Sequence, residues 1–171
     1  MEDSVDIGEL RHRELYQHFS EDELKQFAAV MAVREYDDGQ VIYEVGEDTP
    51  GEKRALLVIL SGEVLLSTEA AAKNRVAVAR TMKAGELIGL VSFINGGRHS
   101  ATCVAKGALR VAVVTREDFQ PLRESKPSLA VLIQYTIAKQ LARDLRICNQ
   151  RLMNALQKGI NRDDLPKFVR P

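Results

Sequence analysis

The chain has 171 residues, with 24 Lys and Arg balanced by 24 Asp and Glu, so its net formal charge is zero. This length suits a single domain that buries its core without disulfides. Phosphate binding relies on a clustered basic excess, and nothing in the balanced charge indicates a dedicated nucleic-acid surface, so we expect no specific nucleic-acid binding.

The first residues carry no signal for export or membrane insertion. Residues 1–8 are acidic and lack an apolar run, and the apolar stretch 55–60 is far too short to span a membrane. The two cysteines, Cys103 and Cys148, have neither metal-ligand spacing nor the pattern of a disulfide framework. We therefore expect a cytoplasmic protein without a membrane partner and without a metal site.

Residues 9–31 carry an apolar stripe that predicts helix, with a break near Ser20. Ser20 followed by Glu23 is a capping-box pattern, which predicts that a second helix begins there.

Residues 32–115 have the character of a β domain. Short β-branched runs alternate with glycine turns, and many short strands with regular turn signals favour a sandwich, jelly roll or barrel. The predicted strands are 41–43, 55–60, 63–67, 76–81, 101–105 and 109–114.

A long helix is predicted after the β region. Residues 117–124 predict a short helix capped by Thr115, and Pro127 then begins a helix that ends near Lys158. Apolar residues recur along it at spacings of three and four, which is typical of a coiled-coil seam: Ala138, Leu141, Leu145, Cys148, Leu152 and Ala155. The spacing alone does not separate pairing with a second chain from docking on the β domain. A helix of roughly thirty residues extends ~45 Å, more than a small β domain covers, so we expect a homodimer through this seam.

The other side of the same helix is charged. Arg143, Arg146 and Arg151 alternate with Asp144, which is typical of the solvated side of a coiled coil. The chain thus divides into residues 1–126 with the β domain, residues 127–158 as dimerisation helix, and a polar tail, 159–171.

Three motifs in this order carry a family resemblance. The runs 38–47 and 56–64 resemble the first two signatures of the cyclic nucleotide-binding domain family, and 85–89 followed by 98–102 resembles its phosphate-binding cassette. The resemblance covers residues 15–158 and is closest to the CRP/FNR type. It implies a mainly β fold with flanking helices: a β-roll (double-stranded β-helix or jelly roll) plus a long C-terminal dimerisation helix. The helix-turn-helix domain of the transcription-factor branch is expected to be missing.

The resemblance also implies residue roles, and the cassette departs from them. In the family a glutamate after the second glycine binds the ribose, and an arginine near the end binds the phosphate. Here Leu90 follows Gly89, and His99 stands at the arginine position when Ser100 is aligned; Arg98 takes that role if the loop slips by one residue. The long helix supplies polar residues to the purine in the transcription-factor branch. The candidate ligand residues are Gly89, Leu90, Val91, Arg98, His99, Ser100, Ala101, Cys148 and Asn149.

Catalytic patterns are missing from the sequence. It contains no nucleophile–base–acid set, Walker loop or dinucleotide fingerprint, and His12, His18 and His99 lack metal-ligand spacing. We therefore expect a non-enzymatic sensor without a cofactor. Its effector is predicted to be a nucleotide-like or small anionic molecule other than cAMP. A ligand-free module that binds a protein partner, and a transcription regulator of the CRP/FNR type, remain as alternatives.

Overall fold

The computed structural model describes residues 5–47, 54–68 and 78–157. Its N-terminal part contains α1 (Gly8–Arg11), the 3-10 helix η1 (Glu14–Tyr16) and α2 (Glu21–Ala28). The predicted capping box is confirmed at α2. The Ser20 amide donates to Glu23 Oε2 at 2.8 Å, and the Glu23 amide donates to Ser20 Oγ at 3.3 Å.

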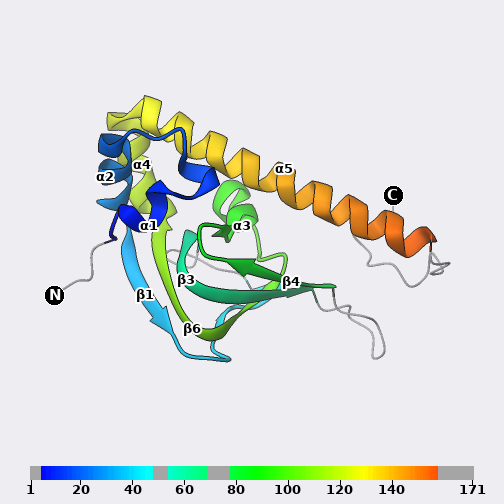
Figure 1. The fold of residues 1–171 in the computed structure, drawn as a ribbon. Coiled ribbons are helices and arrows are strands. Elements are labelled where there is room, and N and C mark those ends of the chain that lie inside the picture. The colour runs from blue at the N-terminus through cyan, green and yellow to red at the C-terminus, as the bar shows by residue number, and fades with distance from the viewer. Residues whose placement is uncertain (1–4, 48–53, 69–77, 158–171) are drawn as a thin grey trace.

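An antiparallel sheet of six strands forms a roll beneath the helices (Figure 1). The main path through the sheet is β1-β6-β3-β4, with β2 paired to β6 and β5 paired to β3. The strands are β1 (Ala32–Tyr36), β2 (Val41–Tyr43), β3 (Ala55–Thr68), β4 (Val78–Lys83), β5 (Leu87–Ile88) and β6 (Thr102–Thr115). The expected β-roll with flanking helices is confirmed.

Two predicted turns are wrong, because the chain continues as strand through them. β3 joins the predicted strands 55–60 and 63–67, and β6 joins 101–105 and 109–114. The register of β3 against β6 shifts near Gly62, so the strand bends at a bulge without ending. Gly62 has φ +85° there, and a Cβ on it would lie 2.4 Å from the carbonyl oxygen of Ala108. The charged strand β1 was not predicted.

The alternating side chains of β3 divide the core into two layers. Leu56, Val58 and Leu60 pack toward the helices, while Leu57 and Ile59 pack into the interior of the roll. Both layers are closed to solvent, which explains why 55–60 is a continuous apolar run.

Two helices follow the sheet. The predicted cap of the first is confirmed: α4 (Arg116–Ser125) begins after Thr115, whose hydroxyl accepts from the Asp118 amide. The second, α5 (Pro127–Gln157), crosses the top of the roll, and its C-terminal part extends beyond it (Figure 1). The predicted end of α5 at Lys158, and the tail 159–171, lie outside the described residues.

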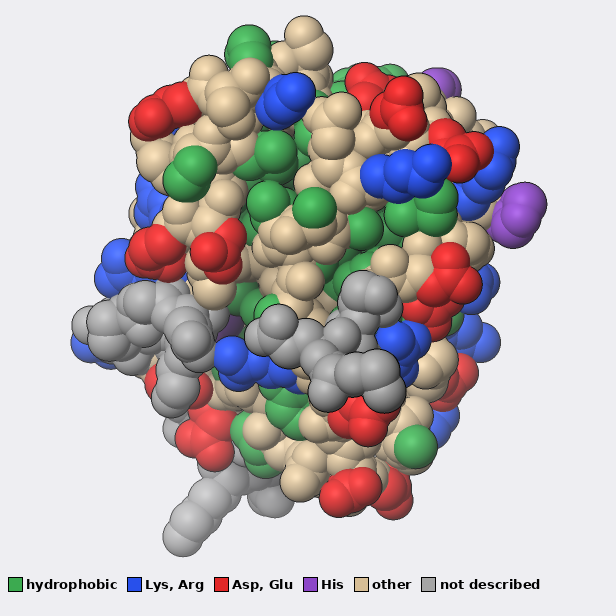
Figure 2. All heavy atoms as spheres, turned by 90° about the vertical axis from the view of Figure 1, so that its left-hand side faces the viewer, with side chains coloured by type: hydrophobic (Ala, Val, Ile, Leu, Met, Phe, Trp, Pro, Cys, Tyr) green, Lys and Arg blue, Asp and Glu red, His purple; other side chains and the backbone are tan. Residues whose placement is uncertain are grey.

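The surface mixes both signs of charge. Figure 2 shows the face at the left of Figure 1, where acidic and basic side chains mingle around hydrophobic ones in the upper half. In the described part of the chain, no helix is long and apolar enough to cross a membrane.

Candidate functional site

A cavity of about 110 Å³ lies between the roll, α3 (Leu90–Asn95) and α5. The cassette contributes one wall of it, strands β3 to β5 contribute a second, and α5 closes it from above. The lining residues are Tyr43, Leu66, Met82, Leu87, Ile88, Gly89, Leu90, Val91, Ser92, His99, Ser100, Ala101, Leu141 and Asp144.

Gly89 produces the sharp turn from β5 into α3. Its φ is +78°, and a Cβ at this position would lie 2.4 Å from the carbonyl oxygen of Ala55. Any other residue would have to combine a strained backbone with that clash, so glycine is required for the close approach of cassette and β3. The next residue, Leu90, is only 6% exposed and belongs to the core cluster beneath the helices.

His99 is held inside the cavity wall rather than at its rim. It is 4% exposed, and its ring stacks on Tyr43 with centroids 4.0 Å apart and an interplanar angle of 11°. Its Nδ1 lies 3.3 Å from Ser92 Oγ, and that hydroxyl donates to the Gly89 carbonyl at 3.1 Å. Ser92 Oγ thus links the His99 ring to the backbone of Gly89 at the start of α3.

Tyr43, which stacks on His99, also contacts Cys103 in the interior of the roll. Burial raises the pKa of Cys103 to about 12, because it outweighs a hydrogen bond with Tyr43 that lowers the pKa. Burial also raises the pKa of Tyr43 well above its ordinary value. Both groups are therefore neutral at physiological pH, and neither supplies a charge to the cavity.

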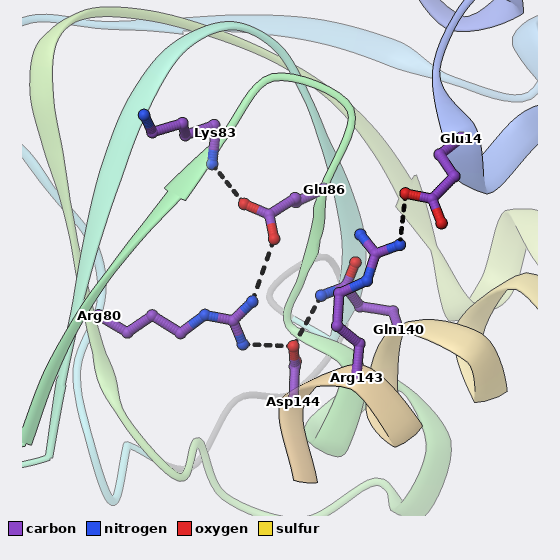
Figure 3. A network of polar contacts seen from close by, with 7 residues as sticks. All are labelled: Glu14, Arg80, Lys83, Glu86, Gln140, Arg143 and Asp144. Carbon is purple, nitrogen blue, oxygen red and sulfur yellow. Dashed lines mark hydrogen bonds and ion pairs between the residues drawn. The ribbon is translucent and has the colours of Figure 1, made fainter. Parts of the chain in front are cut away.

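A network of charged side chains joins the roll to α5 beside the cavity (Figure 3). Arg80 on β4 pairs with Glu86 at 3.1 Å and with Asp144 on α5. Gln140 is fully buried and donates to Asp144 Oδ1 at 2.7 Å. Arg143 points the other way and pairs with Glu14 at 2.9 Å.

The structure brings together most of the predicted cassette residues. Gly89, Leu90, Val91, His99, Ser100 and Ala101 line the cavity, whereas Arg98, Cys148 and Asn149 are not among its lining residues. Arg98, Cys148 and Asn149 are all exposed. Ligand binding by these residues stays a prediction.

The sequence predicted a contribution of α5 at Cys148 and Asn149, whereas Leu141 and Asp144 line the cavity, and no contribution of β4 was predicted. Asp144 and Arg143 were expected on a solvated helix side, but both are partly buried against the domain. Leu141, predicted to lie in the dimer seam, also lines the cavity, and its place in the seam stays a prediction. Tyr43 lies in the first motif and could have been found there. Arg80 lies outside all three motifs, so its role depends on the tertiary contact with α5.

Metal binding has no support in the described residues, since no group of three or more His, Cys, Asp or Glu side chains there could hold an ion.

The family model of the cyclic nucleotide-binding domain matches residues 33–126. Among solved structures, the chain is similar to a cyclic nucleotide-binding domain from Methylobacillus flagellatus KT, with a TM-score of 0.74 and 25% identity over 86% of this chain and 80% of that one. It is also similar to the catabolite activator protein of Thermus thermophilus, with a TM-score of 0.67 and 26% identity over 81% of this chain and 61% of that one. A third similar structure is the N-terminal domain of a transcriptional regulator from Streptomyces coelicolor A3(2), with a TM-score of 0.63 and 23% identity over 86% and 95% of the two chains. No curated protein matches the chain significantly.

Proposed function

The chain belongs to the cyclic nucleotide-binding domain family, and from that premise we propose that it is a non-catalytic, homodimeric regulatory domain that does not bind cAMP tightly. Two free cysteines, one of them exposed, support a reducing compartment such as the cytoplasm. The observation that carries the proposal is the packing of His99 and Leu90, which the sequence alignment places at the two cassette positions that hold the nucleotide in the family.

His99 supports the loss of phosphate binding. It is stacked on Tyr43 and bonded to Ser92, so its ring is packed as part of the wall. An imidazole lacks the planar fork with which a guanidinium binds two phosphate oxygens. Losing a charge-assisted contact of this kind removes ~1.5–3 kcal/mol of binding free energy.

Leu90 supports the loss of ribose binding. Its apolar side chain packs in the core and cannot accept a hydrogen bond from a sugar hydroxyl. Together the two replacements correspond to roughly two to four factors of ten in affinity, although neighbouring contributions need not add. The cavity volume of about 110 Å³ supports the same conclusion, because pockets for drug-sized ligands span roughly 300–1,000 Å³.

The outer face of α5 supports homodimerisation. Apolar and small residues follow spacings of four and three along the side opposite the buried Ile133 and Ile137. This stripe shares Ala138, Leu145 and Leu152 with the seam expected from the sequence, and consists of Val131, Tyr135, Ala138, Ala142, Leu145, Asn149, Leu152 and Leu156. A second copy of the same stripe, related by a two-fold axis, would cover it in a parallel coiled coil.

Calorimetry with cAMP and cGMP tests the proposal. We expect dissociation constants in the high micromolar range or weaker for the unmodified protein. The double variant Leu90→Glu, His99→Arg should bind cAMP measurably, because it restores an acceptor for the ribose and a fork for the phosphate. The matched control Leu90→Gln, His99→Gln changes the same positions without adding charge and should stay weak. A low-micromolar constant for cAMP with the unmodified protein would contradict the proposal.

A second candidate function is the sensor part of a CRP/FNR-type transcription regulator. The similarity to the Thermus thermophilus catabolite activator protein favours it, and the chain spans 61% of that protein. Fluorescence anisotropy with DNA duplexes separates the candidates. We expect only weak, salt-sensitive binding, whereas sub-micromolar binding to one defined duplex at physiological salt would favour the regulator.

A ligand-free module that binds a protein partner is the third candidate, favoured by the small cavity. It predicts that no small molecule raises the melting temperature of the domain, since only a ligand of the folded state stabilises it.

A further inference from the structure

We infer that the cavity takes a small amine, with an ammonium group at Asp144 and an apolar body among the side chains of the roll, and that it rejects anions. The inference rests on the proposed function, because it names the ligand class of the same regulatory site. It replaces the anionic effector expected from the sequence.

The walls of the cavity fit an apolar body. Met82, Leu87 and Ile88 are no more than 2% exposed and provide its floor, and Leu141 of α5 covers it. The aromatic ring of Tyr43 and the neutral hydroxyl of Ser92 complete the inner end. Transfer of apolar ligand surface from water into such a lining is favourable.

The charged groups at the rim favour a cation. Among the described residues that line the cavity, the only carboxylate is that of Asp144, and none is Lys or Arg. Asp144 and Glu86 share the single guanidinium of Arg80, so the three groups carry one positive and two negative charges. Arg80 and Gln140 both contact Oδ1 of Asp144, so Oδ2 is the oxygen that a ligand would contact.

Two neighbouring cations, Arg143 and Lys83, pair with carboxylates other than Asp144. Arg143 pairs with Glu14 at 2.9 Å. Lys83 pairs with Glu63 at 3.6 Å, and its side chain is 71% exposed. At Asp144, one cation is thus shared by two carboxylates, and this local excess of negative charge disfavours a phosphate or carboxylate and favours an ammonium group.

The size of the cavity limits the ligand to about one ring with a short substituent. An engineered apolar cavity of ~150 Å³ in another protein accepts benzene, and the cavity here measures about 110 Å³ with an opening at the rim.

Three probes with the same ring separate charge from size: benzylamine, which is protonated at neutral pH, benzyl alcohol, which is neutral, and benzoate, which is negative. Titrations followed by backbone amide chemical shifts should give benzylamine the tightest binding, about tenfold tighter than benzyl alcohol. Benzoate should not bind measurably. The shifts should be concentrated at Ser92, Leu141 and Asp144.

Variants of the rim assign this preference to particular residues. Asp144→Asn should weaken benzylamine binding about tenfold and leave benzyl alcohol unchanged. Arg80→Gln removes the competing cation and should strengthen benzylamine binding. Glu21→Gln is the matched control: it also removes a carboxylate that pairs with an arginine, Arg11 at 3.1 Å, but away from the cavity, and should change neither probe. Circular dichroism checks that each variant is folded, and the probe series on the unmodified protein tests the inference without any variant.

Two outcomes would overturn the inference. One is tighter binding of benzoate or inorganic phosphate than of benzylamine, and the other is no shift with any probe at millimolar concentration. If either outcome is found while cAMP still binds weakly in calorimetry, the inferred ligand class is wrong and the proposed function stands. Low-micromolar cAMP binding would overturn the proposed function as well.

Discussion

The two halves of α5 share an exposed outer stripe and differ in their other face, which is buried in the first half and not in the described residues of the second. In residues 127–140, Leu129, Ile133 and Ile137 are at most 2% exposed and pack into the core beneath the N-terminal helices. In residues 141–157, Leu145 is 61% exposed and Met153 is 52% exposed. Both halves are equally helical, so the difference arises from what lies beside them.

Helical periodicity therefore identifies an apolar face but not the surface that covers it. The first half is covered by its own domain, because α4 and η1 lie against it. The part of α5 after Asp144 extends past the roll (Figure 1), and none of its described side chains is buried. A helix face of this kind is stable in water when a partner buries it.

Replacing Ile137 with Ala tests the docked half and has the largest expected effect. The side chain is 1% exposed, and its removal leaves a cavity in the core. We expect the free energy of unfolding to fall by ~2–5 kcal/mol, measured by urea denaturation at fixed protein concentration. Gln134→Ala, on the exposed side of the same half, is the control and should change it by less than ~0.5 kcal/mol. Equal effects of the two variants would show that the buried face of residues 127–140 stabilises the domain no more than its exposed face.

Replacing Leu145 with Asp tests the free half. In a parallel dimer it places two carboxylates opposite each other in an apolar seam, so the dissociation constant should rise at least about a hundredfold. Light scattering should then report a monomer with an unchanged circular dichroism spectrum. Gln150→Asp adds the same charge off the stripe and should leave the dimer intact. A monomeric unmodified protein at micromolar concentration would exclude the proposed dimer.

Replacing Arg80 with Met tests the border between the halves, with the smallest expected effect. The change leaves Glu86 and Asp144, which are 20% and 29% exposed, without their shared cation. We expect a loss of ~1–2 kcal/mol in the free energy of unfolding, below that of a fully buried pair because water still reaches both carboxylates. The control Arg143→Met breaks a pair with Glu14, which is 69% exposed, and should cost less than ~0.5 kcal/mol. An effect of Arg143→Met as large as that of Arg80→Met would show that the network beside the cavity stabilises the domain no more than an exposed ion pair does.

Much of the fold could be predicted because its signals are local. The capping box at Ser20, the cap at Thr115 and the start of α5 at Pro127 each depend on residues a few positions apart, and all three are confirmed. The bend at Gly62 was taken for a turn, because glycine marks both turns and bulges. Only the pairing of β3 with β6 decides between them.

The candidate site was predictable only in its cassette. Gly89 and His99 belong to a contiguous motif, so their neighbourhood follows from the order of residues. Arg80 and Asp144 lie 64 positions apart. Their contact exists because α5 crosses the roll at a particular angle, and no spacing in the chain specifies that angle.

By itself, the sequence determined the family and the order of the elements, because both depend on residues that are neighbours along the chain. Tertiary structure alone decided that His99 is packed into a wall, that Leu141 turns to the cavity, and that Asp144 brings a negative charge to its rim. The physical reason is that burial and charge pairing depend on which surfaces meet, and a helical repeat is compatible with several such surfaces.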